Sequence, residues 1–142
     1  DTFFLESTPY NTLVAPSNTG LLISCGSYNS NTGSLAIDSS RGFPRNAVKP
    51  DFTAPGVEIL GPLPRNRYGR KSGTSVSGAI TAGIAALMLE WGIVLKNDMQ
   101  INTTRIKNYL IRGARRDQER IYPNREWGYG QVDLYETFLG IR

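Results

Sequence analysis

Residues 72–89 read SGTSVSGAITAGIAALML and are followed by Glu90. The stretch contains no charged residue, and from Ala79 onward apolar and small residues fall on every side of a 3.6-residue period. This pattern predicts a helix that is buried all round in the core of a domain. A membrane span is the alternative, but the strictly apolar part is too short for a bilayer, starts with Ser, Gly and Thr, and ends at Glu90. We therefore expect a core helix and no membrane partner.

The start of this helix has features that a serine nucleophile needs. Gly73 lets the backbone turn sharply, and Ser75 falls at or near the first helical residue. The amide N–H groups at that point have no partner within the helix, and the helix dipole adds partial positive charge, so an oxygen anion beside Ser75 would be stabilised. Gly73, Thr74 and Ser75 before an apolar run are also typical of an ordinary helix N-cap. Taken alone, the stretch favours this second interpretation.

Composition limits the classes of function. With 142 residues the chain suits one domain that can bury a core. The formal charge of +4 invites a nucleic-acid partner, but we find no nucleic-acid-binding motif around the basic residues. We expect these residues to lie in solvated loops and expect no nucleic acid as partner. They form two main clusters: Arg65, Arg67, Arg70 and Lys71, and Arg112, Arg115, Arg116 and Arg120.

Cysteine, histidine and carboxylate counts limit the chemistry. Cys25 is the only cysteine, so no internal disulfide can form, and its apolar neighbours predict a small buried residue rather than a reactive thiol. The carboxylates do not cluster as a metal site, so we expect no metal and no other cofactor. The chain contains no histidine. Residues 1–4 show no targeting segment and are typical of the middle of a longer protein, which leaves the cellular compartment open.

Short apolar segments separated by Gly- and Pro-marked turns predict an α/β layer arrangement. Helices are predicted from an N-cap within residues 102–104 to a stop at Gly113, and from a capping box of Asp133 and Glu136. A helix that is apolar on every side needs more neighbours than these elements supply, so the chain looks incomplete. Residues 62–71 are expected to form a basic loop, and strands are expected within residues 21–28, 34–37, 52–54 and 57–60, with a short extended piece near 12–14.

Three separated segments carry motifs in a fixed order, and together they resemble the subtilases, the subtilisin-like serine proteases. Residues 73–79, Gly-Thr-Ser-Val-Ser-Gly-Ala, are similar to the family's nucleophile signature Gly-Thr-Ser-Met-Ala-x-Pro. Residues 49–59 resemble the family's strand that ends in Ala-Pro-Gly, and residues 128–133 resemble the Gly-x-Gly stretch before its last helix. The departures at Val76, Ala79 and Ile80 lie behind the nucleophile, so they alter packing more than chemistry.

The resemblance implies a partial subtilisin-like fold. Residues 1–142 would be the C-terminal portion of a subtilase catalytic domain, with part of a mostly parallel sheet, a buried nucleophile helix and peripheral helices. Residues 89–93, 106–116 and 122–130 resemble the clostridial Csp-type subtilases. That family implies germination proteases that trim the pro-piece from a spore cortex-degrading hydrolase, and hence a bacterial spore or extracellular location.

The implied chemistry is amide hydrolysis through an acyl-enzyme. Ser75 would be the nucleophile and its backbone N–H part of the oxyanion hole, with Gly73 and Thr74 as supporting motif residues. In subtilases the catalytic aspartate and histidine precede the serine. The asparagine of the oxyanion hole is expected upstream as well. The three aspartates that precede Ser75 do not lie in the family's aspartate motif: Asp1, Asp38 and Asp51.

The partners follow from the same resemblance. A protein or peptide is the implied substrate, and the missing N-terminal half of the same domain is the implied structural partner. We expect the isolated chain to be proteolytically inactive and to expose apolar surface and unpaired strand edges, which would favour homodimers. Many subtilases bind calcium, but no ligand for it can be assigned on this chain.

Two other functions remain open at this point. The parent protein can be a pseudoprotease that keeps Ser75, has lost the aspartate or histidine, and acts as a regulatory or binding scaffold. The basic cluster of residues 112–120 can instead mark a module that binds an anionic partner.

Overall fold

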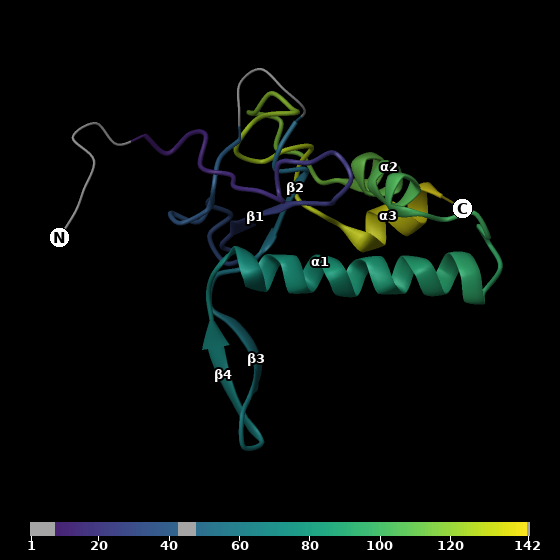
Figure 1. The fold of residues 1–142 in the computed structure, drawn as a ribbon, viewed down its shortest axis with the longest axis horizontal. Helices are drawn as coiled ribbons and strands as arrows, with labels where there is room; N and C mark the ends of the chain where they lie inside the picture. Colours follow the sequence, from purple (N-terminus) through teal and green to yellow (C-terminus); the bar gives the residue numbers. More distant parts are fainter. Residues whose placement is uncertain (1–7, 43–47, 142) are drawn as a thin grey trace.

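A two-stranded parallel sheet lies at the centre of the structure. The computed structural model describes residues 8–42 and 48–141, so the expectations for Asp1 and residues 1–4 fall outside the described residues. Strand β1 (Cys25–Tyr28) pairs in parallel with β2 (Phe52–Pro55), and Cys25 lies opposite Phe52 (Figure 1). Both strands are largely buried, as expected for a parallel pair in an α/β protein. The predicted fold class is confirmed.

Two of the expected extended segments do not form strands. Residues 12–14 have no strand geometry, and residues 34–37 contribute only an isolated antiparallel bridge between Leu35 and Tyr28. Both segments lie in loops, where side chains and turns satisfy much of the backbone.

Both edges of the β1–β2 sheet are hydrogen-bonded to other segments. On the β1 side, Ala36 N–H donates to the Ser27 carbonyl at 2.9 Å, and Ser27 N–H donates to Ser39 Oγ at 3.0 Å. On the β2 side, Thr53 N–H donates to the Gly130 carbonyl at 3.0 Å. Loop segments thus satisfy part of each edge, and the expectation of unpaired edges is wrong at these positions.

Helix α1 (Thr74–Leu89) lies along one face of this sheet and continues into the short π-helix η1 (Glu90–Val94) (Figure 1). Ser77, Thr81 and Met88 are buried. The opposite side is exposed and carries small and apolar residues: Gly78, Ala79, Ala82, Gly83, Ala86 and Leu87. The prediction of a helix buried all round is thus wrong for the described part of the chain, since the sheet covers one side and no described segment covers the other.

By length and apolar composition alone, the helix from Thr74 to Val94 could cross a membrane. A single helix of this kind is weak evidence, because the core helix of a soluble protein passes the same test. In this chain the helix packs against β1 and β2, and its buried hydroxyl groups bond to the protein backbone.

The segment that follows β2 is a hairpin and not the loop that the sequence predicts. Strand β3 (Ile59–Leu63) pairs antiparallel with β4 (Arg67–Lys71), and the hairpin stands away from the rest of the chain beside the start of α1 (Figure 1). The two prolines, Pro62 and Pro64, lie in β3 and in the turn, where a two-stranded sheet tolerates a missing N–H donor.

Helices α2 (Thr103–Gly113) and α3 (Leu134–Gly140) pack against each other beyond the end of the sheet. Their predicted N-caps are confirmed: Asn102 Oδ1 accepts from Arg105 N–H at 3.1 Å, and Asp133 Oδ1 accepts from Glu136 N–H at 3.0 Å. The main core joins β2, α1 and α2 and consists of Phe52, Met88, Ile101, Ile106, Leu110 and Ala114.

A buried ionic network ties β2 to α2. Lys49 and Asp51, just before β2, are each 2% exposed. Lys49 Nζ donates to Asp51 Oδ2 at 2.6 Å and to the Leu22 carbonyl at 2.8 Å. The second carboxylate oxygen, Oδ1, lies 2.9 Å from Lys107 Nζ of α2, and Ser24 N–H donates to Oδ2 at 2.8 Å.

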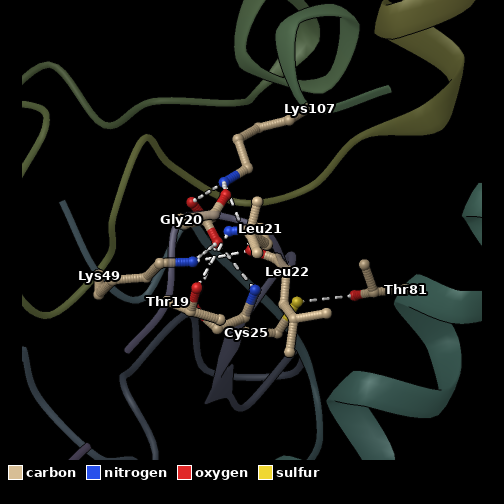
Figure 2. A network of polar contacts seen from close by, with 10 residues as sticks. Thr19, Gly20, Leu21, Leu22, Cys25, Lys49, Thr81 and Lys107 are labelled. Atoms are coloured by element: carbon tan, nitrogen blue, oxygen red, sulfur yellow. Dashed lines mark hydrogen bonds and ion pairs between the residues drawn. The ribbon is translucent and has the colours of Figure 1, made fainter. Parts of the chain in front are cut away.

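Figure 2 shows the side chains of Lys49 and Lys107 converging on the backbone around Gly20 and Leu22. Lys107 Nζ donates to both carbonyls, at 3.3 and 3.4 Å. The network therefore holds the segment before β1 in place, although that segment has no regular secondary structure. Because two ammonium groups and the Ser24 N–H contact it, the carboxylate of Asp51 can remain buried.

We predict that Asp51→Asn strongly destabilises the full-length protein. The change keeps the side-chain shape but leaves the buried Lys49 without a counter-charge, which costs about 3–5 kcal/mol of unfolding free energy. Urea unfolding followed by tryptophan fluorescence measures the loss. Asp38→Asn is the matched control, since Asp38 is exposed, and it should change the free energy by less than about 0.5 kcal/mol. Equal effects of the two substitutions would contradict a structural role for the network.

Candidate active site

Ser75 is the second residue of α1, and its side chain is exposed. The N-cap is Gly73, whose φ of 137° lies in a region that favours glycine. No side chain caps this helix, and no hydrogen bond of the Ser75 hydroxyl is found in the described part of the chain. The ordinary N-cap interpretation is therefore wrong here, and the hydroxyl is free to react.

Ser77 anchors the first turn of α1 to the end of β2. Its Oγ donates to the Ala54 carbonyl at 3.0 Å, with the Pro55 carbonyl at 3.2 Å. A Cβ atom on Gly56 would lie only 2.1 Å from Ser77 Oγ, so only glycine fits between strand and helix. Residues two positions apart in an α-helix are rotated by about 200° around the helix axis. Ser75 therefore lies on the opposite side of the helix from Ser77. The sequence analysis missed Ser77, although a second small polar residue at this spacing was a usable signal.

The backbone before Ser75 is held by two further contacts. Gly73 N–H donates to the Gly56 carbonyl at 2.8 Å, and Ser72 Oγ accepts from Glu58 N–H at 2.9 Å. The first backbone hydrogen bond of the helix runs from Val76 N–H to the Gly73 carbonyl. The Ser75 N–H has no backbone acceptor among the described residues, so it remains available to an oxygen atom bound at the helix start.

A cleft of about 360 Å³ lies beside Ser75. One wall comes from α1, and the others come from the loop 13–17 and from residues 22–25 at the start of β1. The sequence analysis gave the loop no function because it has no periodic pattern. Its position depends on long-range contacts, such as the bond from Thr12 N–H to the Arg41 carbonyl at 3.1 Å. The cleft is lined by Leu13, Val14, Pro16, Ser17, Leu22, Ile23, Ser24, Cys25, Ser40, Thr74, Ser75 and Gly78.

Among the described residues, no charged side chain lines the cleft beside Ser75. The chain contains no histidine. The Asp51 carboxylate is occupied by the lysines of the buried network, and Asp38 is exposed in a loop. No group of three or more potential metal ligands is found among the residues that the structure describes.

Cys25 is a half-buried part of the cleft wall. Its thiol donates to Thr81 Oγ1 at 3.1 Å. Burial raises the pKa of the thiol to about 11, more than the bond to Thr81 lowers it. Because the reactive form is the thiolate, the thiol is inert near neutral pH, as the sequence predicts.

The basic cluster of residues 112–120 is engaged within the domain. Arg115 Nη2 donates to the side-chain carbonyl of Gln131 at 2.8 Å, and the Arg120 guanidinium lies 4.5 Å from the centre of the Trp127 ring. The sequence predicted that these arginines lie in solvated loops, but Arg115 and Arg120 contact other side chains of the domain. Their contacts also weaken the interpretation of the cluster as a free anion-binding surface.

Comparison with known proteins places these features in a family. The chain matches the Subtilase family, Peptidase_S8, over residues 6–130. It is 42% identical to the CspB protease of Clostridium perfringens, whose structure it matches with a TM-score of 0.95 over 99% of this chain and 31% of that chain. It is also 31% identical over 137 residues to the subtilisin-like protease SBT6.1 of Arabidopsis thaliana, a match that covers 91% of this chain and 13% of that protein.

A third relative is the C5a peptidase of Streptococcus pyogenes serotype M18, which is 33% identical over 92 residues, or 61% of this chain and 8% of that protein. The chain thus spans less than a third of the length of each of these relatives. The family match includes the Ala-Pro-Gly turn, the Gly-Thr-Ser signature and the Gly-x-Gly stretch up to Gly130. The chain belongs to the subtilase family.

Proposed function

We propose that this chain supplies the serine nucleophile of a subtilisin-like serine endopeptidase. The observation that supports the proposal is the position of Ser75: an exposed hydroxyl with no hydrogen-bond partner in residues 8–42 and 48–141, at the start of a fixed helix and beside a cleft. This is the arrangement that nucleophilic attack on a bound carbonyl requires.

In the proposed reaction, Ser75 Oγ attacks the carbonyl carbon of the scissile peptide bond. A histidine from a preceding segment accepts the hydroxyl proton and returns it to the leaving amine, and an aspartate orients that histidine. The negative charge on the carbonyl oxygen is stabilised by the Ser75 N–H and by an asparagine, which also precedes this chain. Water then hydrolyses the acyl-enzyme and restores the hydroxyl.

The cleft beside Ser75 would accept one substrate side chain. Its lining is mostly apolar or weakly polar, with Leu13, Val14 and Ile23 on one side and Cys25 as an uncharged thiol. Such a pocket favours an uncharged side chain, because a charge would lose its hydration without gaining a counter-charge.

We further propose a Csp-like role, in which the full-length protease processes the proenzyme of a spore cortex-lytic hydrolase. This rests on the 42% identity to the CspB protease over nearly the whole chain. A spore or extracellular location follows from the same comparison. A calcium site in the parent protein stays a proposal, since this chain offers no assignable ligand.

A pseudoprotease is the second candidate. The observation that favours it is that none of the 142 residues is a histidine, so the fate of the catalytic base is decided outside this chain. In that case the same cleft would bind a polypeptide without cleaving it.

We predict that Ser75→Ala abolishes proteolysis by the full-length protein. Loss of the attacking oxygen should lower kcat by at least about 10⁴-fold. Because the substrate is not identified, labelling with a fluorophosphonate probe is the first measurement: the wild type should be labelled at Ser75 and the variant should not. Ser30→Ala is the control, since Ser30 lies exposed in a turn. A folded wild-type protein that resists the probe would instead favour the pseudoprotease.

We predict that the isolated 142-residue chain neither cleaves casein nor reacts with the probe. Without a base, the Ser75 hydroxyl keeps its proton and is a weak nucleophile. Measurable turnover by the pure chain would show that a base exists within it. Addition of the separately produced N-terminal segment of the domain should restore labelling.

We predict that the isolated chain self-associates in solution. The exposed small and apolar residues of α1 form a continuous face that water solvates poorly, so two copies would gain by covering it. Light scattering should show dimers or larger species at a protein concentration of about 100 µM, which is high enough to detect a weak hydrophobic association. Ala82→Glu, in the middle of the face, should shift the chain toward monomer. A strict monomer for the unchanged chain would contradict this expectation.

A further inference from the structure

The β3–β4 hairpin carries a dense positive charge that the reaction described above does not use. Four cations, Arg65, Arg67, Arg70 and Lys71, lie within seven residues, and all are exposed. Glu58 at the base of β3 is the one acidic residue of the segment 57–72.

These charges are not neutralised within the described part of the chain. None of the four cations takes part in an ion pair there. Arg70 Nη1 donates at 2.6 Å to the backbone carbonyl of Glu58 and not to its carboxylate. The other basic cluster differs, because Arg120 is paired with Asp117 and stacked on Trp127. The hairpin therefore holds a positive potential that is available to a partner.

One face of the hairpin also exposes apolar surface. Leu60 lies opposite Arg70, and Pro62 lies opposite Tyr68, so these four side chains share a face. Leu60 is 62% exposed and Tyr68 is 72% exposed. A surface with an aromatic ring, an aliphatic side chain and a guanidinium group is typical of a polypeptide-binding site.

The other face is partly covered by the hairpin itself. Leu63 is half-buried, and a Cβ on Gly69 would lie 2.6 Å from Leu63 Cδ1. The missing side chain of Gly69 thus lets Leu63 lie across the strands. This self-packing gives the hairpin shape without covering Leu60 and Tyr68.

The hairpin is fixed next to Ser75. Strand β4 ends at Lys71, four residues before Ser75, and the bond from Glu58 N–H to Ser72 Oγ closes its base. No hairpin residue lines the cleft, whose walls come from the loop 13–17, residues 22–25 and α1. Five residues per strand give the hairpin a length of about 17 Å. The hairpin thus lies beside the nucleophile and outside the cleft, where a part of a polypeptide beyond the side chain in the cleft could contact it.

We propose that the β3–β4 hairpin binds an acidic stretch of the polypeptide substrate and so selects substrates with Asp or Glu residues several positions from the cleaved bond. The proposal rests on the proposed protease function and names its substrate class. A polypeptide is favoured over a nucleic acid or a membrane because the hairpin exposes Leu60 and Tyr68 together with its cations, and because it adjoins the nucleophile.

The first experiment measures binding and does not depend on catalysis. Full-length Ser75→Ala protein is titrated against a fluorescein-labelled 12-residue peptide rich in Asp and Glu, and against its Asn and Gln counterpart. At 20 mM salt the acidic peptide should bind about tenfold more tightly, and the difference should disappear at 0.5 M NaCl. Arg65→Gln/Arg67→Gln should remove the difference, whereas Lys96→Gln/Arg112→Gln, which removes two exposed charges elsewhere, should keep it.

The second experiment measures turnover by the wild-type full-length protein. The substrates are fluorescence-quenched peptides with the same randomised centre. Each carries either Asp and Glu or Asn and Gln, placed at its N-terminal or its C-terminal end. The acidic set should be cleaved with a several-fold higher kcat/KM, and the hairpin variant should lose this preference. If no peptide is cleaved but the acidic probe still binds, the protease function fails and the hairpin assignment stands. Equal binding of both probes, or tighter binding of polyuridylate or phosphatidylserine vesicles than of the acidic peptide, would overturn it.

Discussion

The contact between the end of β2 and the first turn of α1 is the constraint on which the site depends. Ser77 Oγ bonds to the last carbonyls of β2, and Gly56 has no side chain to separate the two elements. Because the helix can approach this closely, its unpaired N–H groups and Ser75 are fixed relative to the sheet. A nucleophile on a mobile loop would have to be ordered each time a substrate binds, whereas the Ser75 backbone is already ordered when the chain folds.

A second constraint fixes the cleft. The wall made by residues 22–25 and the loop before it has few backbone bonds of its own, and the buried pairs of Asp51 with Lys49 and Lys107 hold it against α2. An ionic network of this kind adds little to stability relative to an apolar core of the same volume, but it fixes positions with several directed bonds. The network fixes the carbonyl of Leu22, and the bond to Thr81 of α1 fixes the thiol of Cys25.

One side of α1 is exposed to water although its residues are small and apolar. A helix with no charge over four turns and small residues on its outer side has the composition of an interior, yet the described residues cover only one of its sides. The β3–β4 hairpin is the opposite case, since its charge and exposure are compatible with water and with a charged partner. Figure 1 shows the hairpin projecting from the start of α1 away from β1 and β2, so Ser75, the second residue of that helix, lies near the base of the hairpin.

The sequence alone determined the local features: the helix with Ser75 at its start, the N-caps of Asn102 and Asp133, the strands around Cys25 and Phe52, and the family resemblance. These depend on neighbouring residues and on short motifs, which a linear pattern records. It did not determine that residues 62–71 pair as a hairpin, that the loop 13–17 lines the cleft, or that Ser77 and Asp51 are anchors. Each of these depends on atoms from segments that are distant in the sequence, such as Lys107 and Asp51, and only the tertiary structure brings them within bonding distance. Exposed apolar surface on this chain was expected from the sequence, but which side of α1 is covered depends on its tertiary contacts with β1 and β2.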